Sequence, residues 1–146
     1  MRLRNICLMI GICLSASVRA ALWTEIAQDQ VIHKGIDIPA AQLHKKSDRY
    51  VGSVFDERFK FYRIYHDKKS KTPGSRQQVI EGYTHFTARP MTQYVQVVRI
   101  RITPEQERWL REKGVERQDV VRARVRFAGI APGGALAFDL LEVLGR

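Results

Sequence analysis

The sequence predicts a mainly β fold, a small five-stranded barrel with one short helix between the third and fourth strands, preceded by an N-terminal arm. Three observations predict it. Several segments after residue 58 alternate apolar and polar side chains with the period of a strand. One segment among them carries helix start signals. The 146-residue chain, less its export signal, has the length of one ordinary domain.

The first twenty residues have the order of a secretory signal peptide. Residues 1–4 are a short basic start, residues 6–14 are apolar apart from Gly11, and small residues lead to a cleavage point after Ala20. The apolar stretch is shorter than the roughly 20 residues that span a bilayer, which favours cleavage over the alternative of an uncleaved anchor. We therefore expect a periplasmic or secreted protein without a transmembrane span.

The composition constrains what the mature protein can bind. Both cysteines, Cys7 and Cys13, lie inside the signal, so the mature chain has no disulfide and no thiolate metal site. Of 25 Lys+Arg and 15 Asp+Glu, three arginines and no acid lie in residues 1–20, which leaves 22 against 15, a net charge of +7. Such an excess favours an acidic protein, an anionic envelope ligand or nucleic acid, although solubility alone is the plainer explanation.

Residues 21–58 read differently from the rest of the chain. Trp23, Ile26 and Val31 have near-helical spacing, which predicts a short amphipathic helix. The residue before Pro39 avoids the helical region, so the chain should be extended there. We expect this segment to form a partly ordered arm that packs on the main domain or docks a partner.

The main domain, residues 59–146, should begin with three strands. Residues 59–66 are rich in aromatic and β-forming side chains, and the next ten residues form a basic loop with a Pro-Gly turn signal. Residues 79–87 form the second predicted strand, and residues 88–90 interrupt the pattern. Residues 92–103 alternate most clearly and form the third predicted strand.

A short helix is predicted over residues 104–113. Thr103 and Gln106 have the spacing of a capping box, and Pro104 suits the first helical position. Trp109 and Leu110 give the helix its buried side. A plain structural connection explains this helix better than a catalytic role does.

The chain should end in a hairpin. Residues 120–130 alternate cleanly, residues 131–134 form the turn, and a return strand starts at Leu136. The resulting order of three strands, a short helix and two strands is that of an OB-like barrel. No signature motif supports that assignment, because the fold has none.

A row of arginines is the main candidate for a binding site. Arg122, Arg124 and Arg126 share one strand face at intervals of about 6.7 Å, which makes a linear anion-binding stripe. Their alternative role is a solvated face whose arginines pair with Glu81, Asp139 or Glu142 across the sheet. Further candidate anion-binding residues are Arg99 and Arg101 on the third predicted strand, and Lys68, Lys69 and Lys71 in the basic loop.

Four tyrosines are further candidates, because their rings can stack on bases or sugars. A core position is the more usual role of such residues. The histidines lack close metal-ligand spacing, and no nucleophile elbow or phosphate-binding glycine loop is present in the sequence. We therefore predict no catalytic residue, metal or cofactor. The tyrosines are Tyr62, Tyr65, Tyr83 and Tyr94.

These observations predict an exported, non-enzymatic binding or assembly module of the bacterial cell envelope. Its basic strand face would dock an acidic protein or an anionic envelope ligand. One alternative is a nucleic-acid-binding OB-like protein outside the cytoplasm, and another is a small enzyme with a dispersed site.

Overall fold

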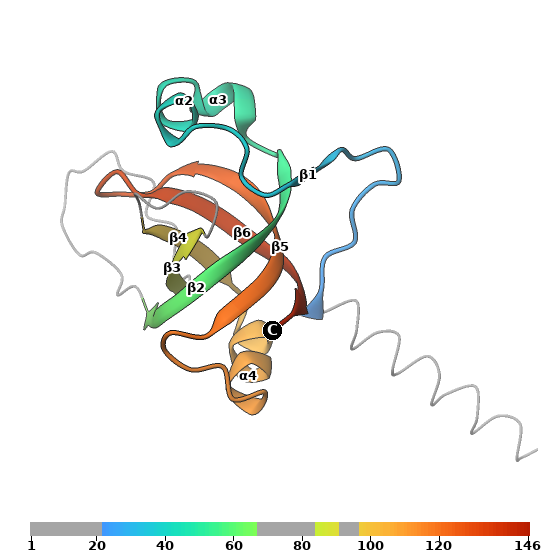
Figure 1. The fold of residues 1–146 in the computed structure, drawn as a ribbon, viewed down its shortest axis with the longest axis vertical. Coiled ribbons are helices and arrows are strands. Elements are labelled where there is room, and N and C mark those ends of the chain that lie inside the picture. Colours follow the sequence, from blue (N-terminus) through green and yellow to red (C-terminus); the bar gives the residue numbers. More distant parts are fainter. Residues whose placement is uncertain (1–21, 67–83, 91–96) are drawn as a thin grey trace, which may run out of the picture.

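The computed structural model describes residues 22–66, 84–90 and 97–146 (Figure 1). The chain is mainly β, as the sequence predicts, and it has one mixed sheet and few helices. The strands are β1 (Ile32–Lys34), β2 (Val54–His66), β3 (Thr84–Pro90), β4 (Val98–Ile102), β5 (Val120–Ile130) and β6 (Leu136–Gly145). The helices are α2 (Ala40–Lys45), α3 (Ser47–Tyr50) and α4 (Pro104–Glu112).

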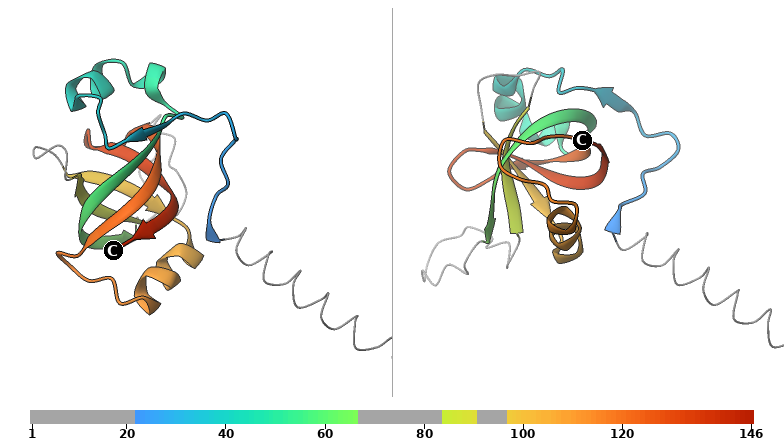
Figure 2. Two further views of the ribbon diagram at one scale, coloured as in Figure 1. Left: turned by 45° about the vertical axis from the view of Figure 1, so that its right-hand side comes forward. Right: turned by 60° about the horizontal axis from the view of Figure 1, so that its bottom comes forward.

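The strands lie in the order β1-β2-β3-β4-β6-β5, and β2 also pairs with β5. The β1–β2 and β4–β6 pairs are parallel, and the other pairs are antiparallel. Figure 2 shows that the strands curve strongly round a common interior. Helices α2 and α3 lie at one end of the sheet and α4 at the opposite end (Figure 1).

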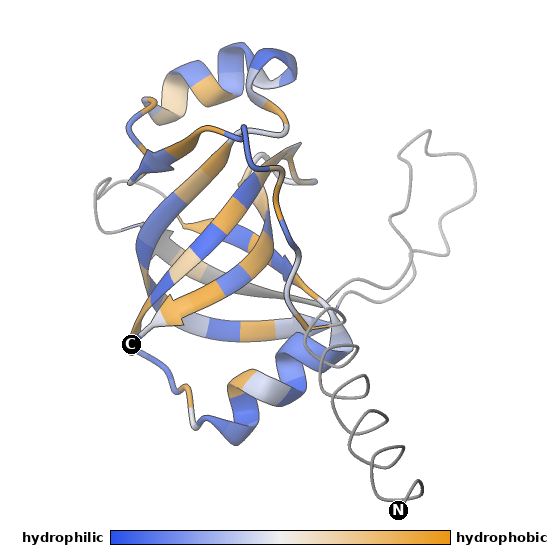
Figure 3. Ribbon diagram, turned by 90° about the vertical axis from the view of Figure 1, so that its right-hand side faces the viewer, coloured by the Kyte–Doolittle hydropathy of each residue, from blue (hydrophilic) through white to orange (hydrophobic). Residues whose placement is uncertain are grey.

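The core consists of the inward side chains of the strands. Buried and more exposed residues alternate along β4 and β5, and Figure 3 shows apolar and polar bands on the strands by colour. Phe138 is fully buried, and its ring centroid lies 6.2 Å from that of Phe55 and 5.4 Å from that of Phe127. Leu43 of α2 and Leu110 of α4 belong to the same buried cluster. The short helices therefore cover the two ends of the core.

Helix α4 and strand β5 form where local signals predict them. Strand β5 covers the predicted residues 120–130, and α4 begins at Pro104 as predicted. The capping box is present, because Oγ1 of Thr103 accepts a hydrogen bond from the Gln106 amide at 3.2 Å and Oε1 of Gln106 accepts one from the Thr103 amide at 3.0 Å. These elements are determined by residues close to them in sequence.

We expect Thr103→Ala to lower the free energy of unfolding by about 1 kcal/mol, because the Gln106 amide loses its acceptor. Chemical denaturation followed by circular dichroism measures this loss. Thr103→Ser keeps the hydroxyl and should unfold within about 0.5 kcal/mol of wild type. Equal destabilisation by both variants would mean that the hydroxyl contributes nothing to the cap.

The predicted helix over residues 23–31 is wrong. This segment has turns and extended backbone up to β1, and the helices of the arm are instead α2 and α3. The Thr24 amide donates a hydrogen bond to the Leu141 carbonyl at 3.0 Å, and the Trp23 ring meets Trp109 edge-on at 5.0 Å. Trp23 packs on α4 and Val31 is largely exposed, so the apolar residues of the segment do not form one buried helix face.

The predicted start of the first long strand at residue 59 also needs correction. Strand β2 begins five residues earlier, at Val54, so the predicted boundary between arm and domain falls inside it. The charges of Asp56, Glu57 and Arg58 are typical of a loop, but Glu57 is buried in the structure. The arm also supplies β1, so the sheet has six strands where the sequence predicts five.

The end of β3 is a third correction. Residues 88–90 are predicted to interrupt the strand, but β3 continues to Pro90, which pairs with Phe59. The last β3–β4 pair is Ala88 with Val98, so the missing amide hydrogen of proline costs no bond to β4. The predicted strand residues 79–83 and 92–96 lie outside the described residues.

Candidate functional site

The predicted arginine row lies on the outer face of β5, and its central member is an ion-pair partner. Nε of Arg124 donates to Oδ1 of Asp56 at 2.7 Å, and Nη2 donates to Oδ2 at 2.9 Å. A carboxylate oxygen of Glu142 lies 3.9 Å from the same guanidinium. The hydrogen bond to Asp56 raises the pKa of Arg124 above its ordinary value, and partial burial only partly opposes this.

The shorter arginine pair on β4 is neutralised in the same way. Arg101 donates to both carboxylate oxygens of Asp139, at 2.5 Å and 2.8 Å. Arg101 and Arg124 are therefore paired across the sheet, Arg101 with Asp139 and Arg124 chiefly with Asp56, which is not among the predicted partners. Within the described residues, no carboxylate pairs with Arg99 or Arg126. The predicted loop residues Lys68, Lys69 and Lys71 lie outside the described residues.

A second group of cations, on the paired outer faces of β2 and β5, is not neutralised. We call Arg58 and Lys60 of β2, together with Arg122 of β5, the β2 cation row. Arg58 lies directly opposite Arg122 in the β2–β5 register, and both side chains are exposed. None of the three has a carboxylate partner among residues that the structure describes. Like charges on opposite strand positions repel each other, so an anion between them would be stabilising.

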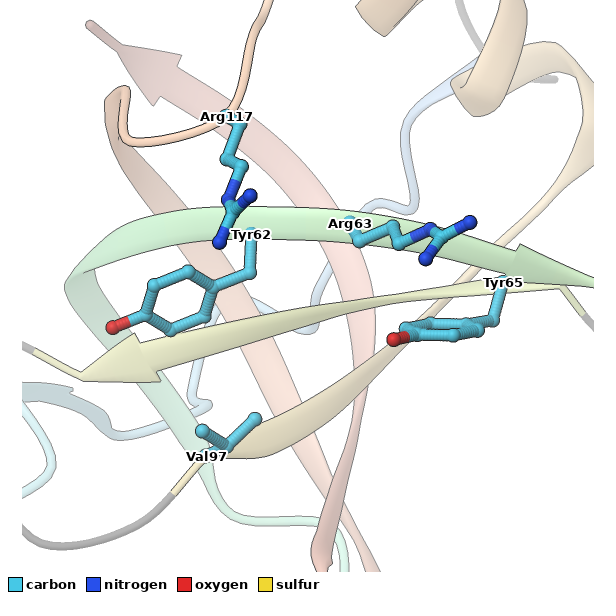
Figure 4. A pocket seen from close by; sticks show the side chains of 5 residues that line it. All are labelled: Tyr62, Arg63, Tyr65, Val97 and Arg117. Carbon is cyan, nitrogen blue, oxygen red and sulfur yellow. The ribbon is translucent and has the colours of Figure 1, made fainter.

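The β2 cation row leads to an open cavity of about 750 Å³, which we call the tyrosine pocket. Figure 4 shows two neighbouring pairs of a ring and a guanidinium among the lining residues, Tyr62 with Arg117 and Tyr65 with Arg63. The Arg63 guanidinium carbon lies 5.4 Å from the ring centroid of Tyr65, and the Arg117 guanidinium points toward the Tyr62 ring. The lining residues that the structure describes are Tyr62, Arg63, Tyr65, Val97 and Arg117.

Two departures from regular backbone build the tyrosine pocket. The β2–β3 register shifts between Phe61 and Arg63, which is a β-bulge at Tyr62. Gln118 has a left-handed backbone with φ of 79°, which is uncommon for a residue other than glycine. The Gln118 amide donates to the Phe61 carbonyl at 2.8 Å, so this strained turn is fastened beside the bulge.

A histidine and a carboxylate meet at the far end of β2. Nε2 of His66 lies 3.0 Å from Oε1 of Glu107, which also accepts a hydrogen bond from Arg111 at 2.8 Å. The His66 side chain is 61% exposed and that of Glu107 is 16% exposed, so the histidine lies on the surface. Burial raises the pKa of Glu107, but its hydrogen bonds and attraction to Arg111 and His66 outweigh burial and lower the pKa below 4.5.

We expect Glu107→Gln to destabilise the protein at neutral pH by at most about 1 kcal/mol. Because the folded-state pKa of Glu107 is lowered, its contribution is full above the unfolded carboxyl pKa and is lost as pH falls through the folded value. The stability difference between variant and wild type should therefore shrink in acid. Urea denaturation at pH 7 and at decreasing pH measures it. A stability difference between variant and wild type that is constant with pH would contradict the lowered pKa of Glu107.

Three of the eight residues in the β2 cation row and the tyrosine pocket are predicted from the sequence. Tyr62 and Tyr65 are predicted as stacking residues, and both line the tyrosine pocket, whereas Tyr83 and Tyr94 lie outside the described residues. Arg122 is predicted as an anion-binding residue. The alternation of Arg58 and Lys60 with Phe59 could have revealed the second group of cations, but the predicted strand began at Phe59 and left Arg58 outside it. Nothing in the sequence indicated that Arg117 lies beside β2.

The described residues show neither a metal site nor a membrane-spanning helix. Across residues 22–66, 84–90 and 97–146, no three His, Cys, Asp or Glu side chains come together as metal ligands. Over the same ranges, every helix is too short or too polar to cross a bilayer. No protein-family model, curated protein or solved structure matches this chain.

Proposed function

We propose that this protein is an exported, non-enzymatic binding or assembly module of the bacterial cell envelope, which holds an anionic ligand or acidic partner on the outer face of β2. The observation that carries the proposal is the β2 cation row, where Arg58 and Arg122 lie opposite each other without a carboxylate. Export rests on residues 1–20, whose order is that of a signal peptide.

We further propose that the scaffold is an OB-like barrel. The strand order and the parallel pairing of β4 with β6 support this, together with the pairing of β2 with β5. The position of α4 between β4 and β5 supports it as well. Such a scaffold presents a rigid outer strand face, so cations on β2 keep a fixed spacing of about 6.7 Å.

The charge pattern of the sheet supports β2 as the binding face rather than the centre of β5. Arg124 and Arg101 already hold Asp56 and Asp139 through paired hydrogen bonds, so an anion would have to displace a carboxylate there. Arg58, Lys60 and Arg122 present positive charge that no described carboxylate neutralises. A polyanion gains most where it meets such uncompensated cations.

The test is binding of inorganic polyphosphate by the full chain, measured by calorimetry at several salt concentrations. Removing both opposed arginines (Arg58→Ala with Arg122→Ala) should weaken binding at least tenfold and reduce the salt slope, because fewer counterions are released. The matched control is Arg49→Ala with Arg108→Ala, which removes the same charge from two exposed helix positions. Equal weakening in the two double variants would show that binding depends only on the net charge of the protein. That result would overturn the proposed site.

A further inference from the structure

We infer that the ligand of this surface is single-stranded nucleic acid, with bases stacked in the tyrosine pocket and phosphates along the β2 cation row. The inference rests on the proposed function, and it names the ligand of the same surface. The observation behind it is that the tyrosine pocket lies at one end of the β2 cation row. Its two tyrosines belong to the same strand as Arg58 and Lys60. Single-strand binding sites combine a cationic path with aromatic stacking positions.

The cation row and the tyrosine pocket form one continuous path. Arg58, Lys60 and Tyr62 occupy successive outward positions of β2, so the path covers about 13 Å before it reaches the first ring. Arg117 lies beside that ring from the loop before β5 (Figure 4). A linear polyanion that follows the cations is therefore led directly to the tyrosines.

The β-bulge gives the pocket both of its rings. In a regular strand, Tyr62 and Tyr65 would point to opposite faces, because three positions separate them. The register shift between Phe61 and Arg63 inserts one residue, so both tyrosines line the same cavity. Bulges and strained residues concentrate at functional sites, and here the bulge and the left-handed Gln118 lie side by side.

The chemistry of the lining favours nucleotides over sugars. The rings offer flat stacking surfaces, with Tyr65 44% exposed, and Val97 adds an apolar contact that is 47% exposed. Arg63 and Arg117 are forked donors that match phosphate and carry no acceptor. Sugar hydroxyls need acceptors as well as donors, and among the described lining residues only the phenol oxygens and backbone carbonyls provide them.

The experiment compares two polyanions on the full chain, oligothymidylate of twenty nucleotides and inorganic polyphosphate of similar charge, at equal salt. Wild type should bind the oligonucleotide at least tenfold more tightly, because only this ligand has rings. Tyr62→Ala with Tyr65→Ala should remove that preference and leave polyphosphate binding within twofold. The matched control, Tyr62→Phe with Tyr65→Phe, keeps both rings and should keep the preference. Thermal melts show whether each variant folds.

The outcomes separate this inference from the proposed function. Equal binding of the two polyanions, or an oligonucleotide preference that survives loss of both rings, overturns the nucleic-acid assignment and leaves the proposed anion-binding face intact. Binding of neither polyanion overturns both. A third arm uses heparin, a sulfated glycan, and a preference for heparin that depends on the tyrosine rings would assign the pocket to sugars instead.

Discussion

Replacing Glu57 by alanine should cost about 3–4 kcal/mol of unfolding free energy, a large part of the 5–15 kcal/mol typical of a domain. Its side chain is only 3% exposed. Oε2 accepts a hydrogen bond from the Ile36 amide at 2.9 Å, and Oε1 accepts one from the Arg58 amide at 2.6 Å. Without the carboxylate, two backbone amides lose a charged acceptor and a cavity opens beside the core.

Glu57→Gln is the control for this prediction, since it keeps the volume and one acceptor oxygen. It should lose clearly less stability than Glu57→Ala in urea denaturation. Hydrogen exchange of the Ile36 amide adds a local readout, and its protection should fall most in the alanine variant. A stable Glu57→Ala protein with a protected Ile36 amide would show that the carboxylate does not hold the arm.

The second large effect is expected at Gln106, which is 2% exposed inside helix α4. Its Nε2 donates to the Leu22 carbonyl at 3.0 Å and to the Leu140 carbonyl at 3.1 Å, while its Oε1 accepts from the Thr103 amide. We expect Gln106→Ala to cost about 2–3 kcal/mol, because one buried and two part-buried backbone groups lose their partner together. Differential scanning calorimetry should record a clearly lower Tm.

An exposed position on the same helix provides the comparison. Glu105→Ala changes a neighbouring residue of α4 that contacts solvent, and it should shift the unfolding free energy by less than about 0.5 kcal/mol. If Gln106→Ala is no more destabilising than this control, the three side-chain hydrogen bonds of Gln106 make no net contribution to the free energy of unfolding. That result would contradict the prediction.

Elements with local signals were predictable from the sequence. The capping box at Thr103 depends on two residues three positions apart, and both of its hydrogen bonds form. The alternation in β5 depends on neighbours two positions apart, and it places Val125 inside and Arg124 outside as predicted. Both signals are read within a single element, so no tertiary knowledge is needed.

Elements that depend on distant partners were not predictable in the same way. A buried glutamate breaks the apolar pattern at the start of β2, and its role depends on the Ile36 amide, 21 residues earlier in the chain. The pairing of Arg124 with Asp56 joins residues 68 positions apart. Without the strand register, the sequence does not distinguish an arginine row that can bind anions from one that carboxylates on a neighbouring strand already neutralise.

The candidate site also combines features that follow from local sequence with features that depend on distant residues. The stacking role of Tyr62 and Tyr65 follows from residue type, but their common face depends on a bulge that the sequence does not announce. Arg117 reaches Tyr62 only because the chain before β5 crosses back to Phe61. The prediction that no catalytic or metal-binding residue is present stays a prediction.

The pairing of β2 with β5 has a kinetic consequence. It joins Val54 to Arg126, so more than seventy residues separate the first pair in sequence. Chains dominated by such long-range contacts fold in milliseconds to seconds, because the entropy of closing a long loop is spent before the contacts form. The refolding rate, rather than the final stability, should therefore be the property most sensitive to changes that alter how readily these two strands meet.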